Sequence, residues 1–113
     1  MKKSLVLAAL FAMSLALPLA AETWKAVPLM DADCAGKADV MAAPDKHTKS
    51  CNVQCSKAGY GIVLNGKFVK FDAKGSELAA AALKKTDHKD NLRVDVNGDL
   101  KGDTIAVKSL SMK

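Results

Sequence analysis

The 113-residue chain is poor in aromatic residues and contains a single arginine. Aromatic residues make up 4% of the sequence, the one arginine is Arg93, and the lysines are spread along the chain rather than clustered. Surfaces that bind nucleic acids usually combine clustered basic residues with arginines and aromatic side chains. We therefore expect no nucleic-acid partner, and we interpret the lysines as a solvated surface.

Several motifs that would indicate a known chemistry are also missing. The sequence has no Cys-x-x-Cys, no Cys-x-x-Cys-His and no Gly-x-Ser-x-Gly. Thioredoxin-like redox chemistry, covalent c-type haem and α/β-hydrolase chemistry are therefore not indicated. Asp31, Asp33 and Asp39 lack the spacing of an EF-hand, so we expect them to be solvated loop residues. We find no catalytic constellation and expect that the protein is not an enzyme.

The N-terminus has the pattern of a secretory signal peptide, residues 1–21. Two lysines precede an apolar run over 5–17, and small residues at 19–21 offer a cleavage site. The run is shorter than the ~20 residues that a helix needs to span a bilayer. We expect a mature protein of residues 22–113, which is one small domain with no membrane segment. Cleavage lowers the net charge from +5 to +3, because Lys2 and Lys3 are removed.

The pattern of the mature chain predicts a mostly β domain with inserted helices. The elements expected in chain order are a strand over 23–30, a long loop over 31–47, a short helix over 48–58, a hairpin over 60–72, a helix over 75–85 and a hairpin over 92–110. This order is typical of a five-stranded OB-like barrel. An open α+β sheet is the alternative.

Turn and capping residues place the boundaries of these elements. Asn65-Gly66 lies between two alternating runs and predicts a tight hairpin turn. A second turn is expected from Asn97-Gly98 through Gly102. Thr48 or Ser50 can cap the first helix, and Ser76 is the expected N-cap of the second.

Three cysteines and one histidine are the residues most able to carry chemistry. His47, Cys51 and Cys55 are each four residues apart, so a helix that began by His47 would place them on one face. Cys34, in the preceding loop, could provide a fourth ligand. Three cysteines and a histidine form a known zinc set, and soft thiolates also suit copper. The candidate metal ligands are therefore Cys34, His47, Cys51 and Cys55.

Disulfide formation is the main alternative use of these cysteines. Exported proteins meet an oxidising environment, in which Cys34 could pair with Cys51 or Cys55. Such a bond would pin the long loop onto the helix and leave one cysteine unpaired. The protein would then be a structural or interaction module of the cell envelope. A third hypothesis is a thiol-redox protein that uses Cys51 and Cys55.

Four stretches of the sequence together resemble a family of small exported bacterial proteins of unknown function. They are DADCAGK with His47 after it, CNVQCSKAGYGIVL, GKFVKFD, and LRVDVNGDLKGDTIAVKSL. The family carries an Asp-x-x-Cys-Gly-like opening, a Cys-x₃-Cys-x₃-Gly segment and a closing pair of strands. This chain departs from the pattern at Ala35, where a glycine is more usual. The resemblance covers nearly all of 23–110, and it implies export and a small β-rich domain but no activity.

These observations together predict a small binding protein located in the periplasm or secreted. We expect it to be a monomer that binds zinc or copper through the cysteine and histidine cluster. Its partner would be the metal ion or, in the disulfide alternative, an envelope protein.

Overall fold

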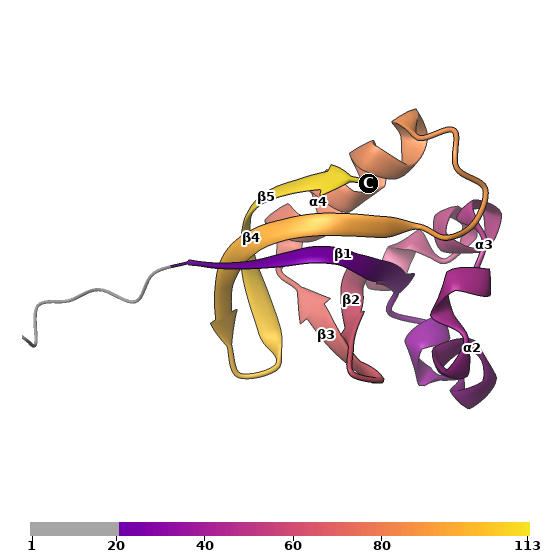
Figure 1. Cartoon of the computed structure of the whole chain (residues 1–113), viewed down its shortest axis with the longest axis horizontal. Helices are drawn as coiled ribbons and strands as arrows, with labels where there is room; N and C mark the ends of the chain where they lie inside the picture. Colours follow the sequence, from indigo (N-terminus) through magenta and orange to yellow (C-terminus); the bar gives the residue numbers. More distant parts are fainter. Residues whose placement is uncertain (1–20) are drawn as a thin grey trace, which may run out of the picture.

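The computed structural model of the chain describes residues 21–113 (Figure 1). The expected signal peptide, residues 1–21, lies outside this range except for Ala21, so its prediction stays open. Within residues 21–113, no helix is long and apolar enough to cross a membrane.

The fold is mostly β, with five strands whose hydrogen bonds form a closed ring. The strands are β1 (Glu22–Asp31), β2 (Tyr60–Leu64), β3 (Lys67–Phe71), β4 (Arg93–Lys101) and β5 (Thr104–Met112). Their order around the ring is β1-β2-β3-β5-β4, and β4 pairs again with β1. All pairs are antiparallel except β3 with β5, which is parallel, so the sheet is mixed. The open sheet is therefore not the arrangement observed, because every one of the five strands pairs on both of its edges.

The main hydrophobic core lies inside this ring and is built from alternating strand residues. Val94 and Val96 of β4 face inward, as do Ile105 and Val107 of β5. Side chains of a strand alternate between its two faces, so an apolar residue at every second position gives the sheet one buried face. A smaller cluster of Met30, Cys34 and Val63 lies beside the main core.

The first predicted hairpin turn is confirmed, and the second is displaced. Asn65 and Gly66 both have positive φ and join β2 to β3. The prediction of a turn that begins at Asn97-Gly98 is wrong, because β4 continues through these residues with a bulge between them. A Cβ on Gly98 would lie 2.5 Å from the carbonyl oxygen of Ala106, so this glycine allows close approach of β5 rather than a turn. The chain turns instead at Gly102, whose φ is +66°.

Helix α4 (Ala73–Lys85) begins two residues earlier than the sequence predicts. Its N-cap is Asp72, whose carboxylate accepts a hydrogen bond from the Gly75 amide at 2.9 Å. Ser76, the expected cap, instead accepts a hydrogen bond from the Tyr60 amide. The buried face of α4 consists of Gly75, Ala79 and Leu83.

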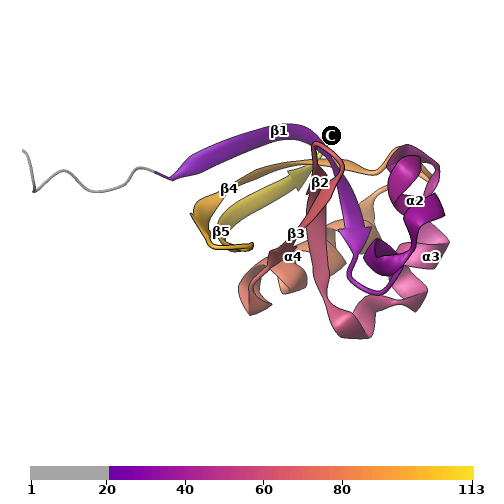
Figure 2. The same cartoon turned by 90° about the horizontal axis from the view of Figure 1, so that it is seen from below.

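The long loop and first helix of the prediction form a helical insertion between β1 and β2. It contains two short α-helices, α2 (Ala38–Ala42) and α3 (Lys49–Gln54). It also contains three single-turn 3-10 helices, which are η2 (Cys34–Gly36), η3 (Pro44–Lys46) and η4 (Ser56–Ala58). Thr48 caps α3 as predicted, since its hydroxyl accepts a hydrogen bond from the Cys51 amide. The insertion lies at one end of the strands, opposite the end at which β1 begins (Figures 1 and 2).

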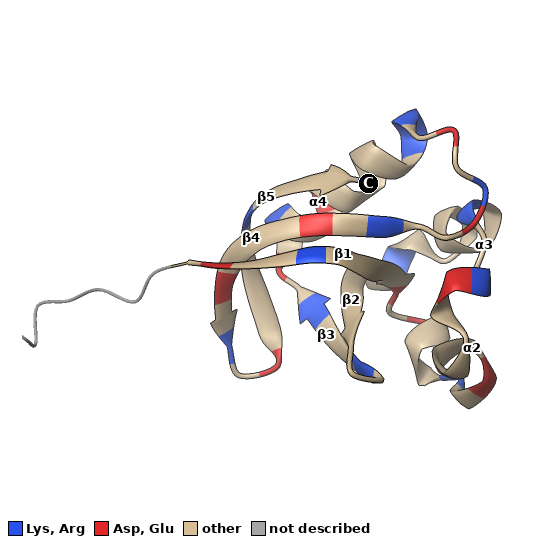
Figure 3. Ribbon diagram, viewed as in Figure 1, with Lys and Arg blue, Asp and Glu red and all other residues tan. Residues whose placement is uncertain are grey.

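Charged residues of both signs are distributed over strands, helices and loops (Figure 3). The lysines do not gather on one element in this view, which agrees with the interpretation of a solvated surface.

Candidate functional site

The end of β1 and the helical insertion bring Asp31, Cys34 and His47 together. Asp31 is the last residue of β1, Cys34 is the first residue of η2, and His47 follows η3 directly. All three are buried: Asp31 is 0% exposed, Cys34 6% and His47 8%. Buried polar groups of this kind are costly to fold unless they are paired, so their grouping is a specific feature of the fold.

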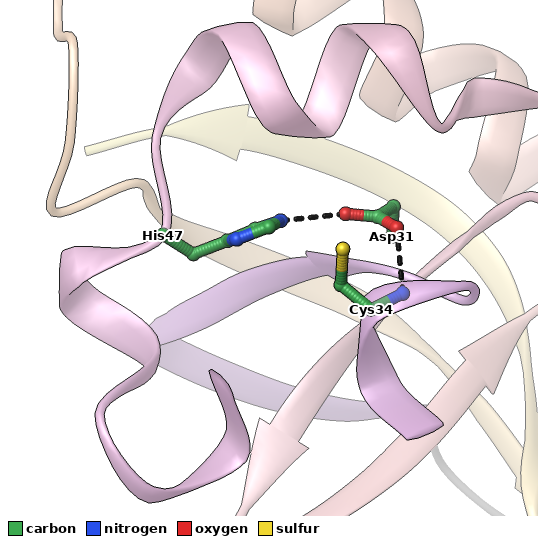
Figure 4. A group of neighbouring side chains, drawn as sticks. All are labelled: Asp31, Cys34 and His47. Atoms are coloured by element: carbon green, nitrogen blue, oxygen red, sulfur yellow. Dashed lines mark hydrogen bonds and ion pairs between the residues drawn. The ribbon is translucent and has the colours of Figure 1, made fainter. Parts of the chain in front are cut away.

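The Asp31 carboxylate organises this group through both of its oxygen atoms (Figure 4). Its Oδ1 lies 2.6 Å from Nε2 of His47, and its Oδ2 accepts a hydrogen bond from the Cys34 amide at 2.9 Å. The two groups share one hydrogen, and a metal ion bound between them would take its place. The imidazole is thereby oriented toward Asp31, and the Cys34 thiol lies beside them.

The potential ligand atoms of these residues are close enough to surround one ion. One carboxylate oxygen, one sulfur and one ring nitrogen all lie within 4.8 Å of one another. Ligands of a tetrahedral zinc ion lie ~2.0–2.3 Å from the metal, which puts neighbouring ligand atoms at separations of this order. The Asp31, Cys34 and His47 group could therefore hold a metal ion.

The surroundings of Cys34 strongly raise the pKa of its thiol. Burial is the largest cause that raises its pKa, and the charge of Asp31 and its hydrogen bond with the thiol raise the pKa further. The nearby Cys55 also contributes, and the pKa rises from 9.0 to about 12. The thiol is therefore fully protonated at neutral pH. A bound cation would reverse this preference, because metal coordination favours the thiolate.

The remaining predicted ligands, Cys51 and Cys55, lie in different surroundings. Cys55 caps the C-terminus of α3, is partly buried and packs against the cluster that contains Cys34. Cys51 is exposed on α3, and neither Cys51 nor Cys55 belongs to the group of ligand atoms around Asp31. The expected single stripe does not form, because α3 begins at Lys49 and His47 precedes its N-cap.

Asp31 is the residue of the group whose surroundings the sequence predicts wrongly. It was expected to be a solvated loop residue, whereas it is fully buried at the end of β1. The Asp-x-x-Cys spacing is the signal that could have indicated its role. A short acidic side chain often accepts a hydrogen bond from a nearby backbone amide further along the chain, which is the bond that Asp31 makes with Cys34.

A buried tyrosine connects the site to helix α3. The Tyr60 hydroxyl donates a hydrogen bond to the Asn52 carbonyl oxygen at 2.9 Å. Burial raises the pKa of Tyr60, and the charges of Asp31 and Cys55 add to the shift, which places this ring near both groups. Asn52 is 0% exposed, and its Oδ1 has no hydrogen-bond partner among the described residues.

Two polar contacts hold the segment around His47 against β4 and the loop before it. Arg93 donates two hydrogen bonds to the Asp45 carboxylate, at 3.0 and 2.7 Å, and a third to the Ala26 carbonyl. On the other side of His47, the Lys49 ammonium group donates to the Thr86 carbonyl at 2.8 Å. The position of His47 therefore depends on residues far away in the sequence.

A small cavity of about 200 Å³ borders His47 on the side of α2. Its lining residues are Asp39, Val40, Ala43, Lys46 and His47. The imidazole is thus the member of the group that meets a cavity, while Asp31 is sealed inside.

No protein-family model, curated protein or solved structure matches this chain. The resemblance to small exported proteins therefore stays a prediction.

Proposed function

We propose that this protein binds a metal ion through Asp31, Cys34 and His47, and that zinc is the ion best suited to the site. The single observation that supports this most is the grouping of three buried ligand atoms of different chemistry within 4.8 Å. Zinc accepts carboxylate, thiolate and imidazole ligands together. Copper(I), the other ion that the sequence suggests, prefers soft sulfur ligands, and the carboxylate makes it the poorer choice.

We propose Cys55 as the fourth ligand; its sulfur lies outside the group of atoms within 4.8 Å of one another, so it would have to approach the ion. Cys55 packs against the same cluster as Cys34 and influences that thiol directly. Structural zinc sites are closed by four protein ligands, whereas catalytic sites keep one position open. A site closed by Cys55 agrees with the expectation of a binding protein rather than an enzyme.

We further propose that the five-stranded ring is an OB-like barrel, on the basis of its strand order, and that the protein acts in the periplasm or outside the cell.

The test is metal content and affinity of the reduced protein expressed from its full-length sequence. We expect one zinc ion per chain and competition with a chromophoric chelator. Cobalt(II) in place of zinc should give an absorption band from sulfur-to-metal charge transfer. Asp31→Asn and Cys34→Ser should weaken binding strongly, because each removes a charged ligand while it keeps the side-chain shape.

Cys51→Ser is the matched control, because Cys51 lies exposed on the same insertion outside the ligand group. This variant should bind zinc like the wild type. Circular dichroism of each variant checks that the fold is retained. A reduced wild-type protein that binds no zinc or cobalt, and whose melting temperature is unchanged by chelator, would contradict the proposal.

A further inference from the structure

Two of the three cysteines share a buried environment, and the third does not. Cys34 is 6% exposed and belongs to the cluster with Met30 and Val63, and Cys55 packs against the same cluster. Cys55 lies near enough to Cys34 to contribute to the raised pKa of that thiol. All three cysteines are free in the structure, and Cys51 is exposed.

This arrangement selects between the two disulfide partners that the sequence left open for Cys34. A disulfide requires its two Cα atoms to lie ~4.4–6.8 Å apart with side chains that face each other. Cys55, at the junction of α3 and η4, packs against the small cluster that contains Cys34. Cys51 lies one helical turn earlier, exposed to solvent and outside the cluster.

We propose that Cys34 and Cys55 form a reversible disulfide, and that this bond and the metal ion are mutually exclusive states of the same site. The inference rests on the proposed function, since the metal ion is the other state. The sulfur of Cys34 would serve both states. Bound to zinc, it is a thiolate ligand that cannot attack a disulfide; joined to Cys55, it is no longer a thiolate and cannot bind zinc.

The oxidation step requires a disulfide oxidant, of which oxidised glutathione is a simple example. The thiolate of one cysteine attacks the oxidant and forms a mixed disulfide, with release of one reduced oxidant thiol. The second cysteine then attacks the protein sulfur of the mixed disulfide, which forms the Cys34–Cys55 bond and releases the second thiol. Two protein thiols are oxidised and one oxidant disulfide is reduced to two thiols. The two protons of the protein thiols pass to the two released thiols.

The proposal is tested with the full chain, equilibrated in buffers of reduced and oxidised glutathione, with zinc as the probe. We expect the number of free thiols per chain to fall from three to one, as counted by alkylation and mass spectrometry. Peptide mapping should find Cys34 linked to Cys55, and the oxidised protein should bind no zinc. Zinc at 100 times its dissociation constant should slow disulfide formation by roughly 100-fold, because only the metal-free fraction reacts.

Cys51→Ser is again the matched control and should form the same disulfide, whereas Cys55→Ser should form no intramolecular bond. The mapping uses wild-type protein, so it remains informative even if Cys55→Ser folds poorly. A Cys34–Cys51 linkage, or oxidised protein that binds zinc as tightly as reduced protein does, would overturn the inference. Failure of the reduced protein to bind zinc is a separate result that contradicts the proposed function itself.

Discussion

The buried thiol of Cys34 predicts a specific loss of stability at alkaline pH. Its pKa is raised from 9.0 to about 12, mainly by burial and then by Asp31. The folded state therefore holds this proton more tightly than the unfolded state does. The stabilisation is complete below pH 9, and it is lost as the pH rises from 9 toward 12.

The size of this effect follows from the shift in pKa. One pKa unit corresponds to about 1.4 kcal/mol, so the free energy of unfolding should fall by about 1.4 kcal/mol per pH unit above pH 9. By pH 11 the loss is about 3 kcal/mol. This is a large fraction of the ~5–15 kcal/mol that stabilises a typical domain.

Urea unfolding of metal-free, reduced protein between pH 8 and 11 measures this loss. Cys34→Ser removes the titrating group, so the difference in stability between wild type and variant should change steeply above pH 9. Tyr60, whose pKa is also raised, titrates in both proteins and cancels in the difference. Cys51→Ser, at an exposed position, is the control for the removal of a thiol outside the site.

A difference between wild type and Cys34→Ser that stays constant from pH 8 to 11 would refute the reasoning. It would mean that the thiol ionises as easily in the folded state as in the unfolded chain. A companion variant, Asp31→Asn, separates the causes of the shift. It removes the neighbouring charge but leaves the burial, so it should reduce the alkaline loss without abolishing it.

Three further predictions concern the framework around the site. Tyr60→Phe should lower the free energy of unfolding by about 1 kcal/mol in chemical denaturation, because the Asn52 carbonyl oxygen loses its donor; an unchanged midpoint would contradict this. Gly61→Ala should lower the free energy of unfolding by about 1–3 kcal/mol, because its Cβ would clash with the Val69 carbonyl oxygen. Gly36→Ala is the control and should leave the free energy of unfolding nearly unchanged, because a Cβ there would have no atom within 4 Å. A double-mutant cycle of Asp45→Asn and Arg93→Met should give a coupling of about 1 kcal/mol or less, because both side chains are more than a third exposed; a much larger coupling would show that the pair is shielded from solvent.

The strands were predicted largely because their signals are local. Alternating apolar residues and the Asn65-Gly66 turn depend on neighbours along the chain, and the first hairpin forms where they indicate. The Asn97-Gly98 turn failed for the same reason. The dipeptide looks the same in a turn as in a bulge, and the approach of β5 to Gly98 decides between the two.

The candidate site shows the same division between local and long-range information. The sequence by itself identified the neighbourhood, since Cys34 and His47 belong to the ligand group and Cys55 packs against the cluster that contains Cys34. It also indicated the cap at Thr48, because capping is a local hydrogen bond.

Only the tertiary structure decided which groups meet. The helix that would have aligned His47 with the later cysteines begins at Lys49, and the imidazole is directed instead to Asp31 at the end of β1. That pairing depends on burial and on contacts across 16 residues of chain, for which no periodicity exists in the sequence. Asp31 is buried at the centre of the group, and not solvated as the sequence predicts, because β1 pairs with β2 there and the helical insertion supplies its partners Cys34 and His47.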